Sequence, residues 1–281
     1  MSLPSPSSST PSSTISLNVV PARTGMTWVK LGIKTFFKQP LALGGLFFMF
    51  MALISLVSQV PFIGAALALA VLPAATVGLM AATDVAANGK FPMPAVLFTA
   101  FRAGSKKTQA ILTLGALYAV GFLLVLGVSA LFDGGQFANF YLGGGGGQAM
   151  TKEIISTPEF QMATWAAMAL YLPLSLMFWH APALVHWHEV SPVKALFFSL
   201  VACFKNFAAM VVYFFMWMAV FSLGGLVLTL VAASTGSESA VTFVMLPAAL
   251  LMATMFFTSI YFTFKDSFSV KNNDLAGVNK Q

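Results

Sequence analysis

The sequence predicts an all-α protein, a polytopic membrane bundle of six transmembrane helices. Of its 281 residues, 58% are hydrophobic and only 8% are charged, so most of the chain has no polar surface to present to water. A helix rises ~1.5 Å per residue and the hydrocarbon core is ~30 Å thick, so an uncharged stretch of about 20 residues can span it. Six stretches of 19 residues or more lack Asp, Glu, Lys and Arg: 41–59, 62–82, 111–132, 162–185, 207–233 and 240–264.

The basic residues predict the orientation, because Lys and Arg favour the cytoplasmic side of a membrane. Of the 14, only Lys152 falls on the other predicted face. Both termini are therefore expected on the cytoplasmic side of the membrane. The net charge of +6 needs no nucleic-acid partner, since this bias and the lipid bilayer account for it. The other 13 are Arg23, Lys30, Lys34, Lys38, Lys90, Arg102, Lys106, Lys107, Lys194, Lys205, Lys265, Lys271 and Lys280.

The chain divides into a tail, a membrane domain and a second tail. Residues 1–25 begin with a segment of Ser, Thr and Pro that cannot bury enough apolar area to fold, so a disordered tail is expected. Residues 26–266 form the six-helix membrane domain. Residues 267–281 are expected to be a loose, polar tail.

Amphipathic connector helices are predicted on the cytoplasmic side, before the first, third and fifth spans. In the first connector, Lys30, Lys34 and Lys38 recur every four residues opposite apolar positions, so it can lie on the inner leaflet. The second follows Pro92 and Pro94, and the third starts at Ser191, with serine as cap and proline at the first helical position.

The connections on the other side differ in length. Val60 and Pro61 alone separate the first two spans, which predicts a tight antiparallel hairpin. The segment 133–161 contains five consecutive glycines, at 143–147, and is expected to be a flexible linker. A phosphate-binding loop is not expected there, because Gly-Lys-Ser or Gly-Lys-Thr is missing.

A threefold repeat of helical pairs is a further hypothesis. Each block would hold a basic connector, a span, an outer turn and a second span with a proline between small residues. The prolines would mark equivalent bends, and one lysine would stand at the start of each block's first span. These residues are Pro73, Pro182 and Pro247, with Lys38, Lys107 and Lys205.

Residues 181–206, APALVHWHEVSPVKALFFSLVACFKN, resemble a signature of an uncharacterised family of betaproteobacterial multi-pass inner-membrane proteins. The wider layout is similar to the membrane domain attached to some glycerophosphodiester phosphodiesterases. The resemblance implies the fold and the location, and it supplies no catalytic residues. Phosphodiesterase activity is therefore not expected.

His180, His186 and His188 are the candidates for metal or haem ligation. A further ligand from another span would be needed, and the six apolar stretches contain no other His, Cys or carboxylate. We therefore favour interfacial histidines beside Trp179 and Trp187, and expect no cofactor. Glu189 is expected to pair with Lys194, and Cys203 to be an apolar filler.

No nucleophile–base pair or metal triad supports an enzyme, and no acidic or basic side chain lies inside the spans. Two functions remain open. One is an accessory or scaffold protein of the bacterial envelope, with a membrane-protein partner or a second copy of itself. The other is a carrier or binding protein for a small lipophilic molecule or lipid, which a hollow path through the bundle would favour over a packed interior.

Overall fold

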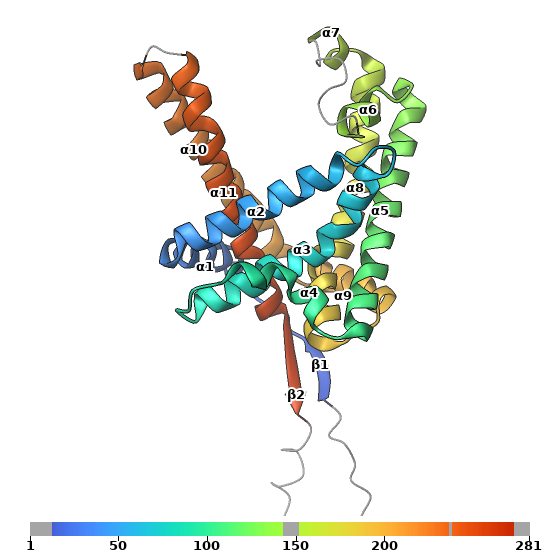
Figure 1. Ribbon diagram of the computed structural model, residues 1–281, viewed down its shortest axis with the longest axis vertical. Coiled ribbons are helices and arrows are strands. Elements are labelled where there is room, and N and C mark those ends of the chain that lie inside the picture. Colours follow the sequence, from blue (N-terminus) through green and yellow to red (C-terminus); the bar gives the residue numbers. More distant parts are fainter. Residues whose placement is uncertain (1–12, 143–151, 236–237, 273–281) are drawn as a thin grey trace, which may run out of the picture.

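The computed structural model describes residues 13–142, 152–235 and 238–272 (Figure 1). It confirms an all-α bundle with six helices that are long and apolar enough to span a membrane: α2 (Pro40–Ser58), α3 (Gly64–Ala87), α5 (Ser105–Asp133), α8 (Pro158–His188), α10 (Phe207–Thr235) and α11 (Glu238–Ser267). The remaining elements are β1 (Ser13–Leu17), α1 (Thr24–Lys38), η1 (Pro94–Phe98), α4 (Thr99–Arg102), α6 (Gln136–Leu142), α7 (Lys152–Ile155), α9 (Pro192–Lys205) and β2 (Phe268–Asn272).

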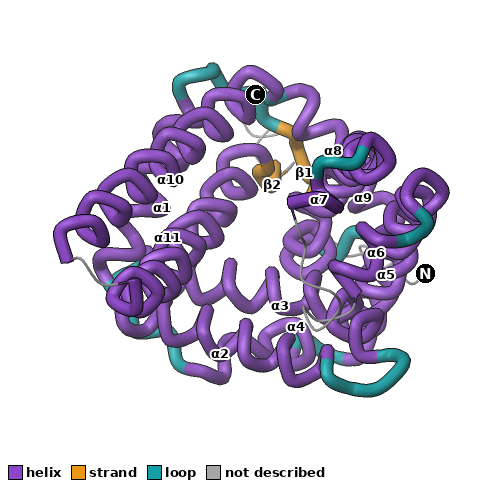
Figure 2. Tube along the Cα trace, turned by 90° about the horizontal axis from the view of Figure 1, so that it is seen from above, coloured by secondary structure: helices purple, strands orange, loops and turns teal. Residues whose placement is uncertain are grey.

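Four of the spanning helices form two arms, and the other two spanning helices, α2 and α3, lie between them (Figure 2). Helices α5 and α8 pack side by side as one arm, and α10 and α11 form the other (Figure 1). Seen from above, α1 accompanies the α10–α11 arm and α9 accompanies the α5–α8 arm, while α2, α3 and α4 lie between them (Figure 2). The connectors α1, α4 and α9 lie toward the end of the molecule that carries β1 and β2 (Figure 1).

A two-stranded antiparallel ladder joins the two ends of the membrane domain. Strand β1 pairs with β2 from Ser13 opposite Asn272 to Leu17 opposite Phe268. Residues 13–25 and 267–272 are therefore ordered, and the expectation of loose tails was wrong for them. Alternating apolar side chains explain the order, because Phe268 is buried in the core and Leu17 packs against it. Residues 1–12 and 273–281 of the expected tails lie outside the described residues.

The amphipathic pattern of α1 serves protein packing rather than only the membrane surface. Its lysines are exposed as predicted, but its opposite face is buried against α10 and α11, and Trp28 is fully buried. At Gly32, an added Cβ would lie 2.8 Å from the Cα of Ser259 in α11. Glycine is therefore what lets α1 approach the two spans so closely.

The second connector and the outer segment are only partly as predicted. The second connector is a short 3₁₀ helix and one turn of α4, and Gly104, with a φ of +93°, separates it from α5. The outer linker contains α6 and α7. Asp133 caps α6, because its carboxylate accepts hydrogen bonds from the backbone N–H groups of Gly135 at 2.8 Å and Phe137 at 2.7 Å. The glycines at 143–147 lie outside the described residues.

The threefold repeat is not confirmed. Pro73 lies nine residues after the start of α3, and Pro247 lies nine residues after the start of α11. Pro182, however, lies 24 residues after the start of α8, near its other end. Prolines that bend helices at different depths do not mark equivalent positions.

The three lysines of the proposed repeat also differ in their contacts. Lys38 donates a hydrogen bond of 3.0 Å to the carbonyl of Ala87 at the end of α3, and Lys107 forms an ion pair with Glu189. Lys205 forms no ion pair and no side-chain hydrogen bond with any residue that the structure describes. The three blocks are thus similar in amino-acid composition but not in the contacts that these lysines make.

Candidate functional site

The three candidate histidines pack against aromatic rings along the last turns of α8. His180 is 1% exposed, and its ring centroid lies 5.6 Å from that of Phe268. His186 lies beside Trp187 at 5.3 Å, and His188 lies beside Phe264 at 5.7 Å. Among the described residues, no group of three or more His, Cys, Asp or Glu side chains is placed to hold a metal ion. The structure therefore does not bring these histidines together as ligands.

A serine from α9 enters the backbone hydrogen bonding of α8 at His180. The His180 N–H donates to the Ser199 hydroxyl oxygen at 2.9 Å, and that hydroxyl donates to the carbonyl of Leu176 at 2.7 Å. Leu176 and His180 are four residues apart, so a regular helix would join them directly. Such an insertion is a known cause of helix bending. With Pro182 two residues further on, two features that can bend a helix lie close together in α8.

Glu189 and Cys203 can be compared with their predicted roles. Glu189 pairs with Lys107 at 3.0 Å, so the expected pairing with Lys194 was wrong. Glu189 ends α8 with a φ of +55°, which turns the chain and directs the side chain toward the start of α5.

Cys203 is buried, and burial raises the pKa of its thiol to about 12. A thiol held protonated in this way has the environment of an apolar filler.

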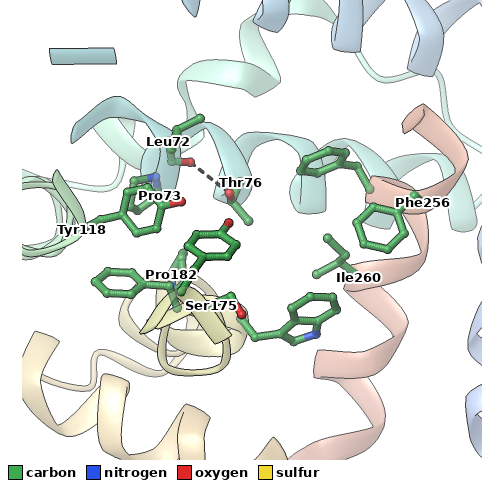
Figure 3. Close-up of a pocket in the computed structure, with 12 residues that line it drawn as sticks. Leu72, Pro73, Thr76, Tyr118, Ser175, Pro182, Phe256 and Ile260 are labelled. Atoms are coloured by element: carbon green, nitrogen blue, oxygen red, sulfur yellow. Dashed lines mark hydrogen bonds between the residues drawn. The ribbon is translucent and has the colours of Figure 1, made fainter. Parts of the chain in front are cut away.

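A cavity of about 290 Å³ lies between four spanning helices (Figure 3). Pro73 and Tyr118 lie on one side of it, Phe256 and Ile260 lie across from them, and Pro182 comes from the third wall. The cavity is therefore lined by α3, α5, α8 and α11, and it is partly open to the outside. Its lining residues are Leu72, Pro73, Thr76, Tyr118, Tyr171, Ser175, Phe178, Trp179, Pro182, Phe256, Phe257 and Ile260.

A few polar groups lie on this apolar wall, and the hydroxyl oxygens of Thr76 and Ser175 among them can accept hydrogen bonds. Thr76 donates its hydroxyl hydrogen to the carbonyl of Leu72 at 2.9 Å, and Ser175 donates to the carbonyl of Leu172 at 2.8 Å. Both hydroxyl oxygens keep lone pairs that can accept from a ligand. Pro182 has no N–H, so the carbonyl of Phe178 lacks its usual helical donor. The cavity thus offers broad apolar and aromatic contact with a few acceptors.

The sequence has a curated relative over almost its whole length. It is 40% identical over 253 residues to a probable inner membrane protein of Burkholderia thailandensis, covering 90% of this chain and 93% of that protein. The chain belongs to that family of inner-membrane proteins. No family model matches the sequence, and no solved structure matches it. Family membership establishes a multi-pass inner-membrane protein, in agreement with the six apolar helices.

The sequence predicted two of the residues that line the cavity to be structurally important, but it did not predict the cavity itself. Pro73 and Pro182 were singled out as bends in separate helices, and the structure shows that both line the same space. Pro247 lies outside that lining. Tyr118, Tyr171 and Ser175 were missed. The signal at Ser175 was weak, because a serine inside an apolar span can bond its hydrogen to the preceding turn and needs no further partner.

Proposed function

We propose that this protein is a non-enzymatic inner-membrane protein that binds a small lipophilic molecule in the cavity between α3, α5, α8 and α11. The cavity itself is the observation that carries this proposal, because a fully packed interior would have favoured a scaffold. Its apolar lining suits a molecule that partitions into the bilayer.

The size of the cavity limits its occupant. Pockets for drug-sized ligands are roughly 300–1,000 Å³, and the cavity, at about 290 Å³, lies at the lower end of that range. A ring compound or a segment of one acyl chain fits this volume, whereas a whole two-chain phospholipid does not. The proposed occupant is therefore a single-chain or single-ring lipophile, or one such portion of a larger lipid.

The proposal includes an orientation with both chain ends in the cytoplasm. The pairing of β1 with β2 supports ends on one face, and 13 of the 14 Lys and Arg residues fall on the predicted inner side. Reporter fusions test this orientation. A fusion within residues 143–147 should report the periplasm, and a fusion after Gln281 should report the cytoplasm. The reverse pattern would contradict the proposed topology.

Filling the cavity tests the proposed ligand. Ser175 lines the cavity, and Ser175→Phe would place an aromatic ring inside it. Ser222 on α10 is exposed, so Ser222→Phe is the same substitution on the outer surface. Native mass spectrometry in mild detergent with added monoolein, an uncharged single-chain lipid, should show binding to the unmodified protein and to Ser222→Phe only. Equal binding to both variants would show that the cavity does not hold the lipid.

An accessory or scaffold role is the second candidate, and the exposure of α10 favours it. The apolar segment of α10 is 6% buried within the protein, whereas that of α3 is 50% buried. Helix α10 therefore presents most of the surface of its later part, after Trp217, to lipid or to another membrane protein. Co-purification of a stoichiometric partner that remains bound to Ser175→Phe would favour this role over ligand binding.

A further inference from the structure

A second pocket lies at the end of α8, where the cytoplasmic connector meets the bundle. Its space is about 380 Å³, and its lining combines the polar side chains of Thr99, Arg102 and His186 with Ala95, Val96 and Ala103. Its walls therefore come from η1, α4, the residue after α4, and α8. Its composition differs from that of the cavity between the spans, since two of its six residues carry nitrogen donors.

The donors of this second pocket are unused within the protein. Arg102 is exposed and forms no hydrogen bond or ion pair with any residue in the described part of the chain. His186 is only 8% exposed, and its Nδ1 atom is buried without a hydrogen-bond partner. Thr99 donates its hydroxyl hydrogen to the carbonyl of Val96. The available donors are therefore the Arg102 guanidinium and the His186 imidazole.

The charge around the pocket is positive. Lys107 lies close enough to His186 for its charge to act on the imidazole, but Glu189 balances that charge by pairing with Lys107. Arg102 and the neighbouring Lys106 have no acidic partner among the described residues. An unpaired guanidinium beside a buried imidazole is suited to a phosphate group, because its planar fork donates two parallel hydrogen bonds.

One face of α8 connects the second pocket with the cavity between the spans. Ser175, Phe178 and Pro182 line the cavity, and His186 lines the second pocket. Their spacings of three and four residues place them on one helical face. Pro182 and His186 are one turn apart, which is ~6 Å along the helix axis. The apolar cavity and the basic pocket are thus successive along one helix.

We propose that the second pocket binds the phosphate of a lipid whose acyl chain occupies the cavity. This inference rests on the proposed function and specifies its ligand as an anionic, single-chain amphiphile. Arg102 and His186 bind the phosphate oxygens, and the face of α8 from Pro182 to Ser175 contacts the chain. A free phosphate ion would satisfy the same donors, but it would leave the adjoining apolar cavity without a role.

Three probes and two variants test this assignment. Lysophosphatidylglycerol carries one chain and a phosphate, monoolein carries one chain without charge, and inorganic phosphate carries charge without a chain. Arg102→Gln removes the proposed donor, and Lys106→Gln removes a nearby exposed cation that does not line the pocket. Binding of each lipid to the full-length protein is measured by native mass spectrometry in mild detergent.

We expect Arg102→Gln to weaken lysophosphatidylglycerol binding about tenfold and to leave monoolein binding unchanged, because only the charge-assisted hydrogen bonds are lost. Lys106→Gln should change neither. Equal weakening by both variants would mean that only general surface charge attracts the lipid, and would overturn the assignment. Binding of inorganic phosphate to the unmodified protein without any binding of lysophosphatidylglycerol would overturn the lipid as the source of the phosphate.

The same measurements separate this inference from the proposed function. If Ser175→Phe abolishes monoolein binding while Arg102→Gln leaves lysophosphatidylglycerol binding intact, the cavity binds a lipophile and the phosphate site is wrong. If monoolein does not bind the unmodified protein at all, the proposed function itself is wrong.

Discussion

The two arms of the bundle are held to the rest of the protein in different ways. Helices α5 and α8 contact each other extensively, and α3 and α9 pack against them. Helix α10 is buried mainly near its start, at Ala209, Tyr213 and Trp217, and its later side chains are largely exposed. The α10–α11 arm is thus attached at one end, whereas the α5–α8 arm is packed along its length (Figure 1).

The base of the α10–α11 arm is correspondingly more polar, both between its two helices and toward α1. The fully buried Ser259 accepts hydrogen bonds from the Tyr213 hydroxyl at 2.6 Å and the Trp217 indole at 3.2 Å, and it donates to the carbonyl of Phe256. Trp28 of α1 donates to Asp266 at 2.8 Å. Where little apolar area is buried within the protein, a few hydrogen bonds and close contacts fix the position of an arm, so single substitutions there should have large effects.

The largest effect is expected from Gly32→Leu, which tests the contact of α1 with the α10–α11 arm. An added Cβ would lie 2.8 Å from the Ser259 Cα, so the backbone of α11 would have to move. Overpacking of this kind costs about 3 kcal/mol. Denaturation in mixed micelles with increasing SDS measures the loss of stability.

Gly45→Leu is the matched control for Gly32→Leu. No atom lies within 4 Å of a Cβ added at Gly45, so the same side chain has open space there. Its free energy of unfolding should stay close to that of the unmodified protein. If both substitutions destabilise equally, leucine in place of glycine is harmful for reasons unrelated to the contact between α1 and α11.

The next largest effect is expected from Asn206→Ala, at the junction of α9 and α10. Asn206 is 2% exposed, accepts a hydrogen bond from the N–H of Val20 at 2.8 Å, and donates to the carbonyl of Asn18 at 3.1 Å. Alanine would leave these partly buried backbone groups without their partner, at a cost of about 2 kcal/mol. The segment before α1 should also become more sensitive to proteolysis.

Asn88→Ala supplies the comparison for Asn206→Ala. Asn88 is exposed, and among the residues that the structure describes its side chain bonds only to Asp84. Its removal should change the free energy of unfolding by less than about 0.5 kcal/mol. Similar losses of stability at the two asparagines would contradict the view that contacts at the start of α10 hold the α10–α11 arm in place.

The sequence predicted the helices well because spanning a membrane is a local property. The uncharged stretch of residues 41–59 can be read directly from the sequence. The apolar face of α1 follows from the spacing of its apolar residues. Asn206 shows the limit of such reasoning. Its partner Asn18 is 188 residues away, so only the folded chain reveals their hydrogen bond.

The candidate site was less predictable for the same reason. Pro73 and Pro182 were predicted to bend their helices, because the lack of a backbone N–H affects the hydrogen bonds within a single helix. That both prolines face one cavity depends on how α3 and α8 pack, and no spacing within either helix contains this information. The pairing of Glu189 with Lys107 rather than Lys194 is similar, because Lys107 on α5 is far from Glu189 in the sequence, whereas Lys194 is close.

A moderate effect is expected from Ser199→Ala in the α5–α8 arm. The substitution removes the hydroxyl that bridges Leu176 and His180, but these two backbone groups can then bond directly to each other. The loss should therefore be about 1 kcal/mol, below that of Asn206→Ala. Ser199→Val adds bulk at a fully buried position without restoring the hydrogen bonds and should cost more. If Ser199→Ala were the most destabilising of these substitutions, the α5–α8 arm would depend on polar contacts after all.

The smallest effect is expected at the ion pair of Lys107 and Glu189, which joins the start of α5 to the end of α8. The two side chains are 29% and 71% exposed, so water screens their attraction, and such pairs contribute about 0.5 kcal/mol. Glutamine is the appropriate replacement for Glu189, because it keeps the side-chain length at a residue whose φ is +55°. A double-mutant cycle with Lys107→Gln and Glu189→Gln isolates the interaction, which should weaken as salt is added. A coupling energy as large as the loss caused by Asn206→Ala would mean that polar contacts hold both arms, and the contrast between the two arms would disappear.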